Sequence, residues 1–157
     1  MTRKRSVQKD SFSIEQATAM LPLVSVIAAD ISHLSRDLLD RLRRLEYLLA
    51  GRNPNDKDVY HEELVQVQAD LENDSRCLRE YLVELKALGV EAANGPEGMV
   101  DFPSVLDGRK VALCWKLGEP EVSYWHDPEA GCAQRRLLTV GSIAEGGIDD
   151  FNGDMSA

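Results

Sequence analysis

Two apolar seams of similar length, separated by a polar turn, constrain the fold of this chain more than any other feature. In each seam, large apolar residues recur at steps of three and four, the spacing of a helix that presents one face to a partner helix. The first seam is Val24, Ile27, Ile31, Leu34, Leu38, Leu45 and Leu48. The second seam is Leu64, Val67, Leu71, Leu78, Tyr81, Leu85 and Leu88. We therefore predict a long antiparallel helical hairpin, coiled-coil-like, over residues 12–90.

Local signals set the ends of these helices. Ser13 and Gln16 have the spacing of a capping box, in which the two side chains satisfy backbone N–H groups at a helix start. Pro22 predicts that this opening helix is short and kinks or breaks there. Gly51 and Gly89 are placed to end the two long helices.

Each seam is interrupted once by a charged residue. Arg41 takes a core position in the first seam and Asp74 takes one in the second. Folding the helices back on each other brings these two positions within about one turn. Two interpretations stay open: a half-buried Arg–Asp pair that sets the register of the helices, or two side chains that reach solvent at the edge of the seam.

After Gly89 the apolar period changes from helical to alternating, which indicates strands. Turn signals at residues 107–108 and 118–120 divide this region. The expected strands are residues 100–104, 110–116 and 121–126. We predict a three-stranded antiparallel β meander within a small module, residues 91–140, that packs on the hairpin. The predicted fold class is therefore α+β, mainly α.

The meander should have a core face and an outer face, because side chains alternate along a strand. Our predicted pairing fills two rows of the core face. One row is Phe102, Leu113 and Tyr124, and the next is Val100, Trp115 and Val122. The outer face then carries Asp101, Cys114, Lys116, Glu121, Ser123 and Trp125. On this pairing Cys114 has no histidine on its face, which favours a small buried hydrophobe over a nucleophile.

The sequence contains no established catalytic signature, so whether the protein is an enzyme stays open. Polar and aromatic residues instead crowd near strand ends and turns, where functional groups tend to lie. The candidate functional cluster is Asp101, Trp115, Glu119, Trp125, His126 and Arg135. Asp101 either accepts hydrogen bonds from a turn, pairs with Arg109 or serves as a ligand. We expect Trp115 in the core and Trp125 at a pocket or an interface.

A divalent metal ion is the cofactor that these residues could hold. His126 ends an expected strand, Glu129 follows it, and Glu119 comes from the preceding turn. Imidazole and carboxylate groups together bind several divalent metals. The alternative interpretation is that His126 caps the sheet edge through hydrogen bonds and Glu119 serves its turn.

The hairpin carries more apolar surface than one seam can bury. Leu39, Leu42, Leu49 and Val65 all lie beside the seams. A second copy of the chain, forming a four-helix bundle, would cover them, and the β module could cover part of them instead. We predict a homodimer through the helices.

Charge and composition argue against several partners. The net charge of −9 disfavours nucleic acid and anionic membranes, and no apolar run approaches the roughly 20 residues that span a bilayer. We expect a disordered basic arm at residues 1–11 and a disordered acidic tail at 141–157.

The three cysteines have no CxxC spacing, which indicates free thiols. Because the basic arm lacks a signal-like apolar stretch, we predict a cytoplasmic protein.

Five blocks of sequence resemble one bacterial and archaeal family. The blocks are FSIEQATAMLPLV, LKALGVE, VDFPS, DGRKVALCWKLGEP and YWHDPEAG. They occur in order between Phe12 and Leu138, and together they resemble domain-of-unknown-function family 2203. The resemblance implies a helical hairpin with a small appended sheet and no known activity. The positions that it marks are Asp101, Phe102, Pro103, Gly108, Trp115, Gly118, Glu119, Trp125, His126, Gly131 and Arg135. The chain departs from the family pattern at Cys132, where an aromatic residue is usual, and at Gln134, where glycine is expected.

Two functions compete on these observations. The first is a non-enzymatic, dimeric interaction or small-ligand-binding protein. The alternative is a divalent-metal-binding module or metal-dependent enzyme with its site around Glu119 and His126.

Overall fold

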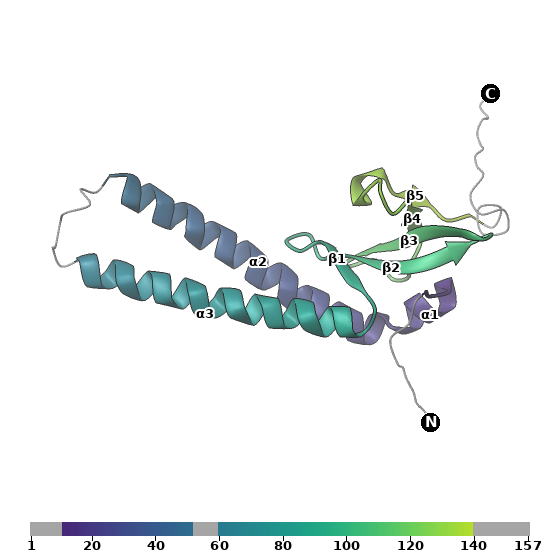
Figure 1. Cartoon of the computed structure of the whole chain (residues 1–157), viewed down its shortest axis with the longest axis horizontal. Coiled ribbons are helices and arrows are strands. Elements are labelled where there is room, and N and C mark those ends of the chain that lie inside the picture. The colour runs from purple at the N-terminus through teal and green to yellow at the C-terminus, as the bar shows by residue number, and fades with distance from the viewer. Residues whose placement is uncertain (1–10, 52–59, 140–157) are drawn as a thin grey trace.

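The computed structural model describes residues 11–51 and 60–139 (Figure 1). Its helices are α1 (Ile14–Ala19), α2 (Leu21–Ala50) and α3 (Tyr60–Ala87). Its strands are β1 (Glu91–Asn94), β2 (Met99–Leu106), β3 (Arg109–Lys116), β4 (Tyr124–His126) and β5 (Arg136–Leu137). The predicted acidic tail, and residues 1–10 of the predicted basic arm, lie outside the described residues. No helix in the described part of the chain is long and apolar enough to cross a membrane.

The predicted fold class, a helical hairpin followed by a three-stranded meander, is wrong. The sheet has five antiparallel strands, in the order β1-β2-β3-β4-β5, where three were predicted. The two strands that the sequence pattern misses are the edge strands. Every residue of β5 is exposed, and β1 has a single half-buried residue. Backbone pairing forms such strands, and it leaves no alternation of apolar and polar residues in the sequence.

The helix ends follow their local signals. The Ser13 hydroxyl accepts a hydrogen bond from the Gln16 N–H, and the Gln16 side chain accepts one from the Ser13 N–H, so the predicted capping box is confirmed. The short α1 ends before Pro22, which lies in the first turn of α2, where its missing N–H has no intrahelical partner to lose. Gly51 caps the C-terminus of α2.

Helices α2 and α3 lie side by side in opposite directions, and their distal halves project beyond the sheet (Figure 1). Leu38, Leu45 and Leu71 form a small buried core between these halves. Beside it, Arg41 makes an ion pair with Asp74 on α3 and a second one, at 3.0 Å, with Asp37. Of the two interpretations that the sequence leaves open, the half-buried Arg41–Asp74 pair is the one that the structure shows.

The main core lies where one face of the sheet packs against the helices. Phe12 joins this core and anchors the start of the described chain to β2. Its N–H donates to the Pro103 carbonyl at 2.7 Å, its carbonyl accepts from the Ser104 hydroxyl at 2.6 Å, and its ring packs edge-on against Phe102. Leu113, Trp115 and Trp125 come from the sheet side of the same core.

The register between β3 and β4 differs from the predicted one by one residue. Leu113 lies opposite Trp125, and Cys114 lies opposite Tyr124. The predicted row that joined Tyr124 to Leu113 is therefore wrong, and so is the outer-face position of Trp125, which is buried in the core. A shift of one residue moves every side chain of a strand to the other face. His126 consequently lies on the face that carries Cys114.

Candidate metal centre

Three potential metal ligands from three adjacent strands converge on the outer face of the sheet. Asp101 on β2 lies opposite Cys114 on β3, and His126 on β4 lies opposite Ala112, two residues before Cys114 on the same face. One side-chain donor atom from each of Asp101, Cys114 and His126 lies within 4.8 Å of the others. Cys114 and His126 are buried, and Asp101 is partly buried.

Hydrogen bonds fix the orientation of the His126 ring. Its Nδ1 atom lies 2.7 Å from the Asp127 carbonyl oxygen. A carbonyl can only accept, so Nδ1 carries a proton and donates it. The other ring nitrogen, Nε2, lies 3.1 Å from both carboxylate oxygens of Asp101. Since Nε2 and a carboxylate both present lone pairs, a proton or a cation must lie between them.

Asp101 is held in a poorly solvated position. Burial raises the pKa of its carboxyl above the ordinary value, against the hydrogen bonds from His126 and Cys114, which lower it. One Asp101 carboxylate oxygen lies within 4.8 Å of both the Cys114 sulfur and a His126 ring nitrogen. The Asp101 oxygens therefore face the same small volume as the other two donors.

The Cys114 thiol is protonated at neutral pH in the absence of a cation. Burial, with the Asp101 charge beside it, raises the pKa of the thiol to about 12, and Arg135 opposes that rise. A thiol of this kind is a poor nucleophile on its own. It becomes a thiolate readily only when a bound cation replaces its proton.

Arg135 reaches the sulfur of Cys114 from the segment that follows β4. Its guanidinium makes two parallel bonds to the Glu119 carboxylate, at 2.7 and 3.2 Å, and stacks 3.9 Å from the centre of the Tyr124 ring. Its positive charge also acts on the Cys114 thiol, whose pKa it lowers. A bidentate, stacked arginine is held in one orientation. A fixed positive charge thus borders the three donors.

The structure places the other predicted site residues elsewhere. Glu119 binds Arg135 and accepts from the Lys116 N–H at 2.9 Å, and its carbonyl accepts from the Trp115 indole at 2.9 Å. Glu129 is exposed. In the ranges 11–51 and 60–139, neither glutamate belongs to a group of convergent metal ligands. Trp125 packs in the core, and the guanidinium carbons of Arg109 and Arg136 lie 5.4 and 5.3 Å from the centre of its ring.

Sequence reasoning missed Cys114 as a member of the site. Asp101 was weighed as a possible ligand and His126 as the central one, but the predicted register put His126 on the opposite face from the cysteine. The signal that could have joined them is the spacing of Asp101 and Cys114 around the turn at residues 107–108, which makes them direct cross-strand neighbours.

The donor set fits a divalent ion with mixed ligand preferences. Imidazole nitrogen, thiolate sulfur and carboxylate oxygen are the three ligand types of Zn²⁺, at bond lengths of about 2.0–2.3 Å. Metal-binding histidines usually donate their second ring N–H to a carbonyl or carboxylate, as His126 does to Asp127. The three donors are close enough to share one ion after at most a small inward movement.

Comparison with known proteins gives a family and no closer relative. The family described as an uncharacterized conserved protein (DUF2203) matches residues 10–138, which include all three strands of the site. No curated protein and no solved structure matches the chain.

Proposed function

The chain belongs to this family of uncharacterised conserved proteins, and from its site we propose that it is a divalent metal-binding protein. The proposed ligands are an Asp101 carboxylate oxygen, the Cys114 sulfur and His126 Nε2. Zn²⁺ is the ion that this combination of oxygen, sulfur and nitrogen favours.

The observation that carries the proposal is the convergence of three chemically suitable donors around a histidine with its second nitrogen already occupied. The Asp127 carbonyl fixes His126 with Nε2 directed at Asp101. The competing interpretation is a purely structural His–Asp hydrogen bond beside an inert thiol. That interpretation gives Cys114 no role, whereas a metal site requires its sulfur as a ligand.

Three protein ligands leave one position of a tetrahedral ion open, as in zinc sites that bind water or substrate. The Arg135 charge acts on Cys114, one of the three proposed ligands. We propose that the open position takes a water molecule or a small ligand with an oxygen donor. This assignment combines the metal-binding and small-ligand-binding functions that the sequence left as alternatives.

Cobalt substitution tests the proposal. Co²⁺ bound by a thiolate gives a charge-transfer band in the near ultraviolet, and a tetrahedral site gives strong visible bands. We expect the full-length protein to show both at one equivalent of Co²⁺ and to lose both when one equivalent of Zn²⁺ is added. Cys114→Ser should abolish the charge-transfer band, while Cys77→Ser and Cys132→Ser, the matched controls, should keep it.

A second set of variants separates this centre from the one predicted by sequence. Glu119→Gln and Glu129→Gln remove the carboxylates of the predicted site, and Asp101→Asn removes the carboxylate of the proposed one. We expect only Asp101→Asn to weaken Zn²⁺ binding, by about 10-fold or more, in competition with a chromophoric chelator. Metal-free wild-type protein with no gain in thermal stability from Zn²⁺ would contradict the proposal.

Two other predictions stay proposals alongside this one. A reducing compartment such as the cytoplasm would keep Cys77, Cys114 and Cys132 in the free form that the structure has. A homodimer through the helices would cover apolar side chains that project from α2 and α3, among them Leu42 and Val65.

A further inference from the structure

A line of residues along α3 faces away from the core of the molecule. Val65 and Val83 are 52% and 68% exposed, and they are eighteen residues apart in the sequence. At 3.6 residues per turn this separation is about five full turns, so the two valines lie on one line along the helix, roughly 27 Å apart. An exposed valine is apolar, and its helix propensity is lower than that of alanine or of the polar residues usual on a helix surface. Their common line therefore marks a surface that suits an apolar partner.

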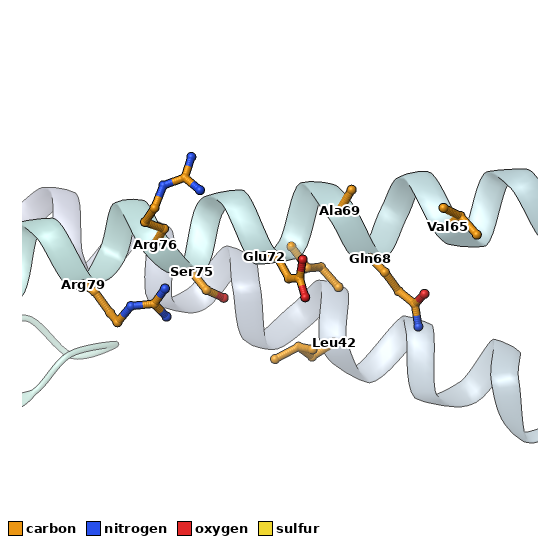
Figure 2. Close-up of a pocket in the computed structure, with 9 residues that line it drawn as sticks. Leu42, Val65, Gln68, Ala69, Glu72, Ser75, Arg76 and Arg79 are labelled. Atoms are coloured by element: carbon orange, nitrogen blue, oxygen red, sulfur yellow. The ribbon is translucent and has the colours of Figure 1, made fainter.

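Opposite charges lie between the two valines. Glu72 and Arg76 are one helical turn apart on this side of α3, with Ala69 between Val65 and Glu72 (Figure 2). Across residues 11–51 and 60–139, the Glu72 carboxylate takes part in no ion pair, and Arg76 bonds only to the Asn73 side chain of its own helix. Both charges are exposed and remain available to a partner.

The same side of α3 borders a groove. Its walls are α3 and the distal half of α2, and Leu42, 44% exposed, projects from α2 into it (Figure 2). Gln68 and Ser75 line the α3 side. At Leu42 the groove offers a partner helix an apolar contact, beside the line of Val65, Glu72, Arg76 and Val83.

We propose that this surface binds a second copy of the chain. The two α3 helices run antiparallel, and the two-fold axis that relates them passes the helix at the level of residue 74. Val65 and Val83 lie nine residues to either side of that position, and Glu72 and Arg76 lie two residues to either side. The axis therefore places each Val65 against the partner subunit's Val83. It also places each Glu72 against the partner subunit's Arg76.

The self-complementary order of these residues is the argument for a second copy over a different protein. A two-fold interface uses the same patch on both subunits, so the patch must match itself when reversed. Reversal about position 74 pairs valine with valine at both ends and opposite charges in the middle, with no like charges opposed. This interface is independent of the proposed metal site, which lies on the sheet.

Charge reversal tests the interface in the full-length protein. By sedimentation equilibrium we expect a dimer for the wild type, and a dimer dissociation constant raised at least about 10-fold by either Glu72→Arg or Arg76→Glu. The double variant should recover near wild-type affinity, because the axis pairs the two reversed charges again. Glu84→Arg is the matched control: it is the same charge change on the same helix, about 100° around from the line.

Several outcomes overturn the proposal. A wild-type protein that sediments as a monomer up to about 100 μM refutes it, because a dimer weaker than that has no role at cellular concentrations. Single variants that dimerise as the wild type does place the dimer on another face, and a double variant that stays monomeric refutes the pairing of Glu72 with the partner subunit's Arg76. Circular dichroism of each variant confirms that the helices are intact. Repeating the wild-type measurement with EDTA and with Zn²⁺ separates this result from that of the metal site.

Discussion

Replacing His126 with phenylalanine should destabilise the metal-free protein by about 3 kcal/mol. Phenylalanine fills the space of the buried ring but makes neither of its hydrogen bonds. The Asp127 carbonyl loses its donor, which at a half-buried residue costs about 1 kcal/mol, and the Asp101 carboxyl loses its hydrogen bond to the ring Nε2, which costs about 2 kcal/mol. The Asp101 side chain is 22% exposed, so the loss stays below that of a fully buried charge.

A double-mutant cycle isolates the His126–Asp101 interaction. Asp101→Val alone leaves one ring nitrogen without a partner and should cost about 1 kcal/mol. In the double variant both groups are gone, and the expected loss is about 2 kcal/mol rather than the sum of the two single losses. The coupling free energy should therefore be about 2 kcal/mol, which is large for a pair of side chains.

Urea unfolding measures all four proteins in EDTA at pH 8 and at one protein concentration, because a dimer would make stability concentration-dependent. Circular dichroism reports the helices, and fluorescence reports Trp115 and Trp125, of which Trp125 neighbours His126 in β4. Equal m-values are needed before the midpoints are compared as free energies. Additive single losses, or a loss below about 1 kcal/mol for His126→Phe, would mean that the hydrogen bonds described for His126 do not hold the strands together.

Three smaller perturbations test contacts elsewhere. Gly98→Ala should lower stability by roughly 2 kcal/mol in thermal unfolding, because the new Cβ would lie 2.8 Å from Leu117 Cβ at a backbone φ of +69°. Asp74→Leu should cost about 2 kcal/mol by urea titration, whereas replacing Arg41 and Asp74 together by leucine should change stability by less than about 1 kcal/mol. In metal-free protein, Cys114 should react with iodoacetamide far more slowly than it does in urea, as mass spectrometry can follow, because burial raises the pKa of its thiol to about 12.

The helical part of the chain could be predicted in detail because its signals are local. A capping box needs two residues three apart, and Pro22 is tolerated only in the first turn of a helix. Arg41 and Asp74 are far apart in the sequence. The two seams indicate which faces of the helices meet, and the single turn between the helices indicates which positions lie opposite each other, so these two residues can be aligned. Each of these interactions is encoded in the spacing of residues along the chain.

The sheet was predicted less well because its edges carry little apolar pattern. Strand β5 consists of Arg136 and Leu137, both exposed, and it is held to β4 by backbone bonds. Such a strand looks like a loop in sequence. Its position matters for the site all the same, because Arg135, next to β5 in the chain, reaches Cys114.

The error in the site itself comes from the segment that leads into β4. The predicted strand began at Glu121, which made Val122 and Tyr124 share a face. In the structure Val122 and Trp125 both point into the core, three residues apart, because the segment before Tyr124 is irregular and the Val122 N–H donates to Thr18 on α1 at 3.4 Å. Strict alternation cannot produce that spacing.

Contact with α1 therefore decides on which side of the sheet His126 lies. Both Tyr124 and Trp125 are aromatic, so the residue types alone allow either register, and in the observed one Trp125 enters the core together with Val122. That register puts His126 beside Asp101 and Cys114. The donors of the proposed metal centre are separated by 13 and 12 residues in the sequence, and their convergence depends on a tertiary contact that no ligand spacing encodes. A site of this kind becomes visible only when the register of the strands is known.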